Sequence, residues 1–215
     1  MSFRTPASIV NEFNRLTMIM FGGYRVGKTT AALKLAEAGE KVYLFTVDRG
    51  IRAVARQPKK YKGNLFISTA STLDEMRDDT AQVRDHLRAK IAKGDGANMT
   101  KTWVVTDTIT HLQTALLVEA RTVEIKGTTE PTRQVNTQRD ATTRADYNIN
   151  LAWLTELTAR FLEIPCNILF IALEKDGKNG LPTAMLSGQS HGRILGSCDI
   201  ISRMVRDSET RDAQL

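Results

Sequence analysis

A glycine-rich stretch that ends in a lysine and two threonines offers the chemistry for binding phosphate groups. Residues 16–21 form a short apolar run, and the pattern Gly22-x-x-x-x-Gly27-Lys28-Thr29 follows it directly. Glycines allow successive backbone N–H groups to converge on one anion, and the start of a helix adds further unpaired N–H groups. The spacing therefore predicts a nucleotide phosphate loop made of Gly22, Gly23, Tyr24, Arg25, Val26, Gly27, Lys28, Thr29 and Thr30.

Three side chains are expected to act directly on a nucleotide and its metal ion. Lys28 supplies a positive charge for the β- and γ-phosphates, and Thr29 supplies a hydroxyl group for Mg²⁺. Residues 103–107, Trp-Val-Val-Thr-Asp, form an apolar run that ends in a carboxylate. This pattern predicts that Asp107 holds Mg²⁺ through water. ATP and Mg²⁺ are therefore the expected ligands.

Two further carboxylates follow predicted strands. Asp48 comes after the second strand and is a candidate general base for the water that attacks the γ-phosphate; starting a turn is the alternative. Glu174 comes after the fifth strand and is a candidate sensor of the γ-phosphate, while an ordinary surface glutamate is the alternative. The residues themselves leave both alternatives open.

The composition is that of an ordinary globular chain. Of the 215 residues, 41% are hydrophobic and 25% are charged, which suits one α/β domain with a sizeable core. Apolar runs stay well short of the roughly 20 residues that a membrane span needs. The two cysteines, Cys166 and Cys198, have no metal-binding spacing. A cytoplasmic location is the expectation.

The net charge of +6 is concentrated in one short segment. Residues 49–62 contain no acidic side chain and six basic ones, namely Arg49, Arg52, Arg56, Lys59, Lys60 and Lys62. A local excess of this kind suits a polyanion or an acidic partner, and a solvated basic turn is the alternative.

Predicted strands and helices alternate along the chain. This order predicts a doubly wound α/β domain, with a mainly parallel sheet and helices on both faces. Strands are expected at 16–21, 41–47, 64–68, 101–106 and 167–173, with final strands around Ile194 and over 200–205. Helices are expected at 8–15, 28–38, 73–93, 110–124 and 147–163. Residues 1–215 are taken as a single domain with a frayed tail at 207–215. The loops at the carboxyl ends of the strands then share one edge, where ligands bind.

Two long polar segments interrupt this alternation. Residues 126–146 are rich in threonine and nearly devoid of apolar side chains, and residues 175–192 carry four glycines and a proline. Both are predicted as loops, and loops of this length in a compact domain are usually functional or disordered.

Taken together, these features resemble the RecA-like P-loop ATPases. The phosphate loop, a second strand that ends in Asp48, the sequence Val-Val-Thr-Asp107-Thr108 and a fifth strand running into Glu174 carry the resemblance over residues 16–206. The order and compact size are most similar to phage-encoded RecA-like proteins of single-strand annealing and recombination. That family typically has Glu where this chain has Asp48, and Gln where it has Glu174.

The resemblance implies a DNA-stimulated ATPase that forms a homo-oligomer, a ring or a filament, on single-stranded DNA, with a possible phage recombination or single-strand-binding partner. It places DNA contacts in the two loops, on Lys126, Arg133, Arg139, Arg144, Lys175 and Lys178. It also implies a basic residue supplied in trans by the neighbouring protomer, for which the candidates are Arg193, Arg203 and Arg206.

Two other functions stay open. One is a nucleotide-gated binding or loading module with little turnover, which the substitutions at Asp48 and Glu174 favour. The other is a small-molecule kinase, because residues 126–146 hold three arginines that could serve in a lid. Two P-loop classes fit less well: Phe21 stands where a ParA-type loop needs lysine, and Glu174-Lys-Asp176 does not match the guanine-binding Asn-Lys-x-Asp.

Overall fold

Short apolar runs, rich in β-branched and aromatic residues, form the central sheet of this computed structural model. The structure describes residues 15–47, 54, 58–61, 63–122, 142, 144–177, 180–187 and 189–206. These residues form a seven-stranded sheet in the order β3-β2-β4-β5-β1-β7, with β6 paired to β5. The strands are β1 (Thr17–Gly22), β2 (Lys41–Thr46), β3 (Leu65–Ser68), β4 (Thr102–Asp107), β5 (Asn167–Asp176), β6 (Pro182–Ala184) and β7 (Ile200–Arg203).

All strand pairs are parallel except β5 with β6, so the carboxyl ends of the parallel strands lie along one edge. In the register of the sheet, Gly22 at the end of β1 is opposite Leu173 of β5, and Phe21 is opposite Arg203 of β7. The predicted doubly wound fold with a mainly parallel sheet is confirmed. β1, which leads into the phosphate loop, lies between β5 and β7.

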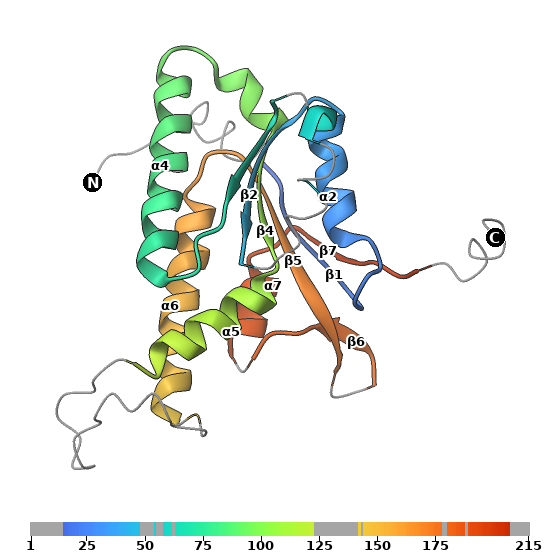
Figure 1. Ribbon diagram of the computed structural model, residues 1–215, viewed down its shortest axis with the longest axis vertical. Helices are drawn as coiled ribbons and strands as arrows, with labels where there is room; N and C mark the ends of the chain where they lie inside the picture. Colours follow the sequence, from blue (N-terminus) through green and yellow to red (C-terminus); the bar gives the residue numbers. More distant parts are fainter. Residues whose placement is uncertain are drawn as a thin grey trace.

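Helices cover both faces of the sheet. They are α2 (Lys28–Glu37), α4 (Leu73–Ala92), α5 (Ile109–Ala120), α6 (Arg144–Leu162) and α7 (Gln189–Gly196), with 3₁₀ turns η2 (Pro58–Tyr61) and η3 (Gly96–Lys101). Figure 1 shows α2 on one side of the sheet and α4 and α6 on the other. A helix on each face explains why the central strands are apolar on both sides.

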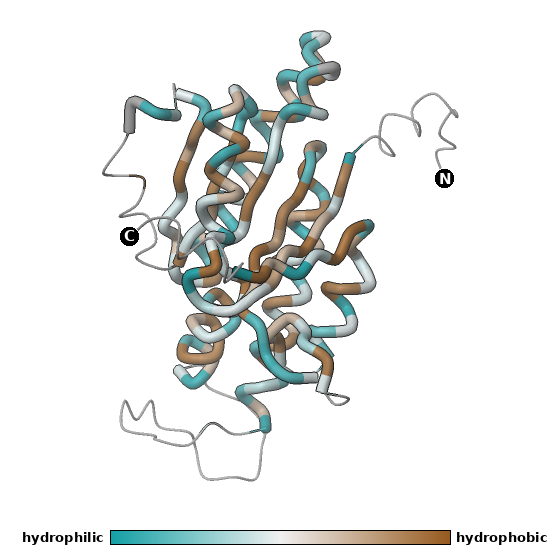
Figure 2. Tube along the Cα trace, turned by 90° about the vertical axis from the view of Figure 1, so that its right-hand side faces the viewer, coloured by the Kyte–Doolittle hydropathy of each residue, from teal (hydrophilic) through white to brown (hydrophobic). Residues whose placement is uncertain are grey.

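The core consists of two apolar layers, one on each face. Ala32, Leu33 and Ala36 of α2 pack with Val54 and Tyr61 on one face. On the other face, α4, α5, α6 and α7 bury a larger set that includes Leu112, Leu157 and Phe161. In Figure 2 the hydrophobic colour accordingly runs along the strands in the middle of the molecule. Among the described helices, none has the length and apolarity that crossing a bilayer requires.

Most predicted elements match the structure to within a few residues. The helix predicted at 73–93 is α4, and Thr72 caps it: its side chain accepts a hydrogen bond from Glu75 N, while the Glu75 side chain accepts one from Thr72 N. Gly39, with φ +96°, follows α2, as glycine commonly does where a helix ends. Residues 8–14 of the helix predicted at 8–15, and the tail at 207–215, lie outside the described residues.

The prediction of a loop over 175–192 is wrong in part. β5 continues to Asp176, β6 returns beside it, and α7 begins at Gln189. Gly177 makes this hairpin possible, because a Cβ atom there would meet the carbonyl oxygen of Leu181 at 2.6 Å. The strand predicted around Ile194 is also wrong: Ile194 lies in α7, and its side chain is buried in the core. Similarly, α6 begins at Arg144, inside the segment predicted as loop 126–146.

Candidate functional site

The predicted phosphate loop forms a tight turn between β1 and α2. Arg25 and Gly27 both have left-handed backbone conformations, with φ of 60° and 99°. Such conformations let a short segment fold back on itself and aim successive N–H groups inward. Position 22 requires glycine, because a Cβ atom there would lie 2.3 Å from the carbonyl oxygen of Met204. The backbone of the loop is therefore held against the segment that follows β7.

The amino end of α2 has the properties of an anion-binding site. Gly27 is the N-cap residue and provides no side-chain hydrogen bond, and the first turn holds no acidic residue. The first hydrogen bond of the helix runs from Ala31 N to Gly27 O at 2.9 Å. The N–H groups before it have no acceptor within the helix, so a phosphate group can take that role.

Lys28 is nearly buried at the base of this loop, with an exposed fraction of 7%. Its Nζ donates hydrogen bonds to the carbonyl oxygens of Gly22 at 2.9 Å and of Gly23 at 2.6 Å. Burial lowers the pKa of Lys28 from its ordinary value, while the negative charges of Asp107 and Glu174 act in the opposite direction. The ammonium group thus lies within electrostatic range of both carboxylates.

Thr29 and Asp107 meet although they are 78 positions apart in the chain. Thr29 Oγ1 donates a hydrogen bond of 2.7 Å to Asp107 Oδ2, at the carboxyl end of β4. A hydroxyl and a carboxylate are the oxygen ligands that Mg²⁺ prefers, and this spacing lets both face one ion. Among the described residues there is no cluster of three or more His, Cys, Asp or Glu side chains that could hold a metal. The donor set fits Mg²⁺ that takes its other ligands from phosphates and water.

Glu174 lies on β5, the strand next to β1, and is bound to an arginine of the same chain. Arg203 Nε donates to Glu174 Oε2 and Arg203 Nη2 donates to Glu174 Oε1, both at 2.9 Å. This hydrogen bonding, together with the charges of Arg203 and Lys28, lowers the pKa of Glu174 from its ordinary value. The structure therefore places Arg203, a candidate for action in trans, beside Glu174 within one protomer.

The other predicted site residues are spread more widely. Arg144 begins α6, Lys175 is on β5 and donates a hydrogen bond to Leu186 O, and Arg193 is on α7 with Nη1 3.1 Å from Thr155 Oγ1. Arg206 is exposed just beyond β7. Asp48, Lys126, Arg133, Arg139 and Lys178 lie outside the described residues, so their roles stay predictions. Of the basic segment 49–62, Lys60 pairs with Glu37 at 2.8 Å.

A polar network that the sequence reasoning missed connects this site to the segment after β6. Thr110 Oγ1 accepts a hydrogen bond from Leu173 N and donates one to Met185 O, both 3.0 Å. Gln113 Oε1 accepts one from Ser187 N at 3.0 Å. Because α5 begins just after Asp107, these bonds fix the end of β5 and residues 185–187 to the Asp107 strand. The sequence did contain a signal for this network: Gln113 lies inside the largely apolar stretch 109–120, and a buried amide needs hydrogen-bond partners.

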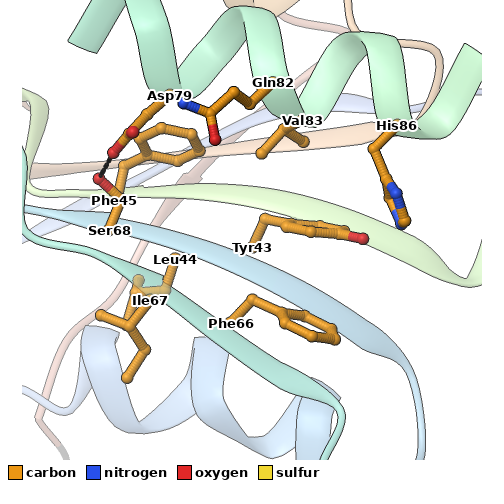
Figure 3. A pocket seen from close by; sticks show the side chains of 10 residues that line it. All are labelled: Tyr43, Leu44, Phe45, Phe66, Ile67, Ser68, Asp79, Gln82, Val83 and His86. Atoms are coloured by element: carbon orange, nitrogen blue, oxygen red, sulfur yellow. Dashed lines mark hydrogen bonds between the residues drawn. The ribbon is translucent and has the colours of Figure 1, made fainter. Parts of the chain in front are cut away.

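A separate cavity of about 410 Å³ lies between β3 and α4. Figure 3 shows Tyr43 and Phe66 side by side at its wall, with Val83 and His86 of α4 opposite and Ser68 hydrogen-bonded to Asp79. β3 is at the end of the sheet, and β2, β4 and β5 separate it from β1. This cavity is therefore distinct from the phosphate loop.

A phosphate loop after a central parallel strand, with an aspartate at the end of another strand facing its threonine, defines a P-loop nucleoside-triphosphate-binding domain. The sequence model for the AAA domain matches residues 14–214, which is nearly the whole chain. The chain therefore belongs to this family of AAA domain proteins, whose P-loop fold is that of an ATPase.

Comparisons with individual proteins add little to this assignment. No curated protein sequence matches significantly. A crystal structure of the RadB recombinase is similar with a TM-score of 0.46 and 15% identity, covering 87% of this chain and 73% of that one. A crystal structure of a KaiC-like protein from the archaeon Pyrococcus horikoshii has a TM-score of 0.49 and 15% identity, covering 90% and 74%. Neither similarity is close enough to transfer an activity.

Proposed function

We propose that this AAA domain protein is a Mg²⁺-dependent ATPase that assembles as a homo-oligomer on single-stranded DNA in phage recombination or annealing. The observation that supports it most directly is the convergence of Lys28, Thr29 and Asp107 on the phosphate loop. This is the arrangement that P-loop enzymes use to hold the β- and γ-phosphates and their metal ion.

Each residue of the loop has a distinct task in this proposal. The N–H groups at the start of α2 and the Lys28 ammonium group bind the phosphates, while Thr29 and Asp107 hold Mg²⁺. Bound Mg²⁺ would neutralise the charge that develops on the transferred phosphoryl group. Asp48 follows β2 in the sequence and is the candidate for orienting the attacking water.

The DNA-binding part of the proposal is supported by position and charge. Figure 1 shows that the amino end of α6 and the β5–β6 hairpin lie toward the same end of the molecule. Arg144 and Lys175 are exposed there. In the sequence they belong to the two polar segments that also contain Lys126, Arg133, Arg139 and Lys178. Since neither predicted loop contains an aromatic side chain, binding is expected to depend on phosphate contacts more than on base stacking.

The test is to measure phosphate release from ATP without DNA, with single-stranded DNA and with duplex DNA, using Lys28→Ala as the blank. Stimulation by single strands that disappears in the variant is the expected result. Affinity for single strands should fall steeply with salt, with a logarithmic slope of roughly −0.7 for each phosphate contact. A flat salt response would contradict the DNA-binding proposal.

A second candidate is a nucleotide-gated binding or loading module with little turnover. The ion pair between Glu174 and Arg203 favours this function. In it, a carboxylate takes the place of the glutamine amide that is typical of the RecA-like family. Tight ATP binding without phosphate release would identify this function. Phosphoryl transfer to a small acceptor would instead identify the kinase that the sequence left open.

A further inference from the structure

The ion pair between Glu174 and Arg203 spans the strand that leads into the phosphate loop. β5 and β7 pair with β1 on its two sides, and Arg203 is opposite Phe21, the residue before Gly22. Glu174 directly follows Leu173, which is opposite Gly22. The two side chains therefore meet at the carboxyl end of β1, where the loop begins.

The chemistry of the pair differs from that of either residue alone. An ionised Glu174 would repel the terminal phosphate and has no proton to donate. Arg203 neutralises this charge through Nε and Nη2, and its Nη1 group takes no part in the bond to Glu174. A guanidinium group carries five N–H donors, so it can hold a carboxylate and still donate to a phosphate.

The charge of Glu174 and that of Lys28 in the phosphate loop act on each other. The Glu174 charge acts to raise the pKa of Lys28, and the Lys28 charge helps to lower the pKa of Glu174. In addition, the carbonyl oxygen of Met204, the residue after Arg203, is packed against Gly22. Any phosphate that Lys28 binds thus comes close to the end of β7.

We propose that Arg203, positioned by Glu174 of the same chain, contacts the terminal phosphate of a bound nucleoside triphosphate and so distinguishes a triphosphate from a diphosphate. This inference rests on the proposed nucleotide binding and assigns Arg203 a role in cis. Glu174 is the positioning residue: it fixes the guanidinium group through Nε and Nη2 and leaves Nη1 outside the ion pair.

The test compares equilibrium affinities for a non-hydrolysable ATP analogue and for ADP, both with Mg²⁺, at a concentration where sedimentation shows a monomer. Arg203→Ala should weaken analogue binding about 10-fold or more and leave ADP binding within about 2-fold, as for loss of a charge-assisted hydrogen bond. Arg203→Lys keeps the charge but loses the planar arrangement of N–H donors. Its affinity for the analogue should therefore lie between those of the wild type and Arg203→Ala. Arg88→Ala, an exposed arginine of α4, is the matched control.

Variants of Glu174 separate this role from that of a structural ion pair. Glu174→Gln retains an acceptor for Arg203 and removes the negative charge, so the preference for the triphosphate should be kept or strengthened. The double variant Glu174→Gln/Arg203→Ala should recover part of the loss, because no unpaired carboxylate then faces the phosphate. Equal effects of all variants on analogue and ADP binding would overturn the inference.

A mixing experiment distinguishes action in cis from action in trans. Combining Arg203→Ala with Lys28→Ala protein pairs an intact loop with a neighbour that carries an intact Arg203. Under the inference, this mixture should bind the analogue no more tightly than Arg203→Ala alone; restored binding would overturn it. Failure of the wild-type protein to bind either nucleotide would instead overturn the proposed function, and this inference with it.

Discussion

Two pairs of side chains at the phosphate loop are built in different ways. Thr29 and Asp107 form the hydroxyl–carboxylate pair that motif spacing predicts for a magnesium site. Glu174 and Arg203 form an ion pair across the end of β1, which motif spacing did not predict. The first pair follows the general pattern of P-loop enzymes, and the second does not. We infer that binding of the nucleotide with its metal ion depends on the first pair, and the response to the bound nucleotide on the second.

The largest effect is expected for Lys28, on which the charges of Asp107 and Glu174 both act. Lys28→Ala should weaken triphosphate binding by about 100-fold or more, because a nearly buried cation that contacts the phosphates is lost. Lys34→Ala, an exposed lysine in the last turn of the same helix, is the control and should bind normally. Calorimetric titration measures both. Equal affinities for the two variants would show that the loop is not the nucleotide site.

A smaller loss of function is expected from changing Asp107, the carboxylate of the predicted magnesium site, alone. Asp107→Asn should reduce phosphate release about 100-fold, because the amide weakens the hold on Mg²⁺, while metal-free ADP binding should stay within about 3-fold. Asp78→Asn, on an exposed part of α4, serves as the control. The measurement is phosphate release over a range of Mg²⁺ concentrations. Unchanged turnover would remove Asp107 from the metal site.

Two neighbouring glycines test how tightly the loop is held against the segment after β7. Gly22→Ala should destabilise the protein by about 2 kcal/mol, because its Cβ would lie 2.3 Å from Met204 O. Gly23→Ala should cost less than about 0.5 kcal/mol, since the nearest atom, Val26 Cγ1, would be 3.8 Å away. Urea unfolding compares the two variants. Similar losses would mean that this close approach does not constrain the loop.

The smallest expected effect is the pH dependence of the stability that the Glu174–Arg203 ion pair contributes. Arg203 holds the pKa of Glu174 below its ordinary value of 4.5, so the ionised pair stabilises the fold above that pH and loses this contribution as the pH falls. Glu174→Gln lacks the titrating group. The stability difference between wild type and variant should therefore shrink on acidification below 4.5. Urea unfolding across this range measures it, and a constant difference would exclude linkage to Glu174.

Local patterns predicted most of the elements, and the exceptions have a physical explanation. The strands that become β1, β2 and β4 are apolar runs bounded by turn residues, so their positions follow from sequence alone. Residues 175–192 contain several glycines and Pro182, which predicted a loop, yet β6 and α7 form there. β6 exists because it can pair with the extended end of β5, and α7 because Ile194 can be buried in the core. Both conditions depend on neighbours that local patterns do not contain.

By itself, the sequence determined the phosphate loop, the aspartate after the fourth strand and the doubly wound fold, because each depends on residues adjacent in the chain. The tertiary structure decided the contacts within the site. Thr29 reaches Asp107 across 78 positions, as the motifs had predicted, whereas Arg203 reaches Glu174 across 29 positions, a contact that no motif had predicted. The physical reason is the parallel sheet. It brings the carboxyl ends of β1, β4, β5 and β7 to one edge whatever their separation in sequence.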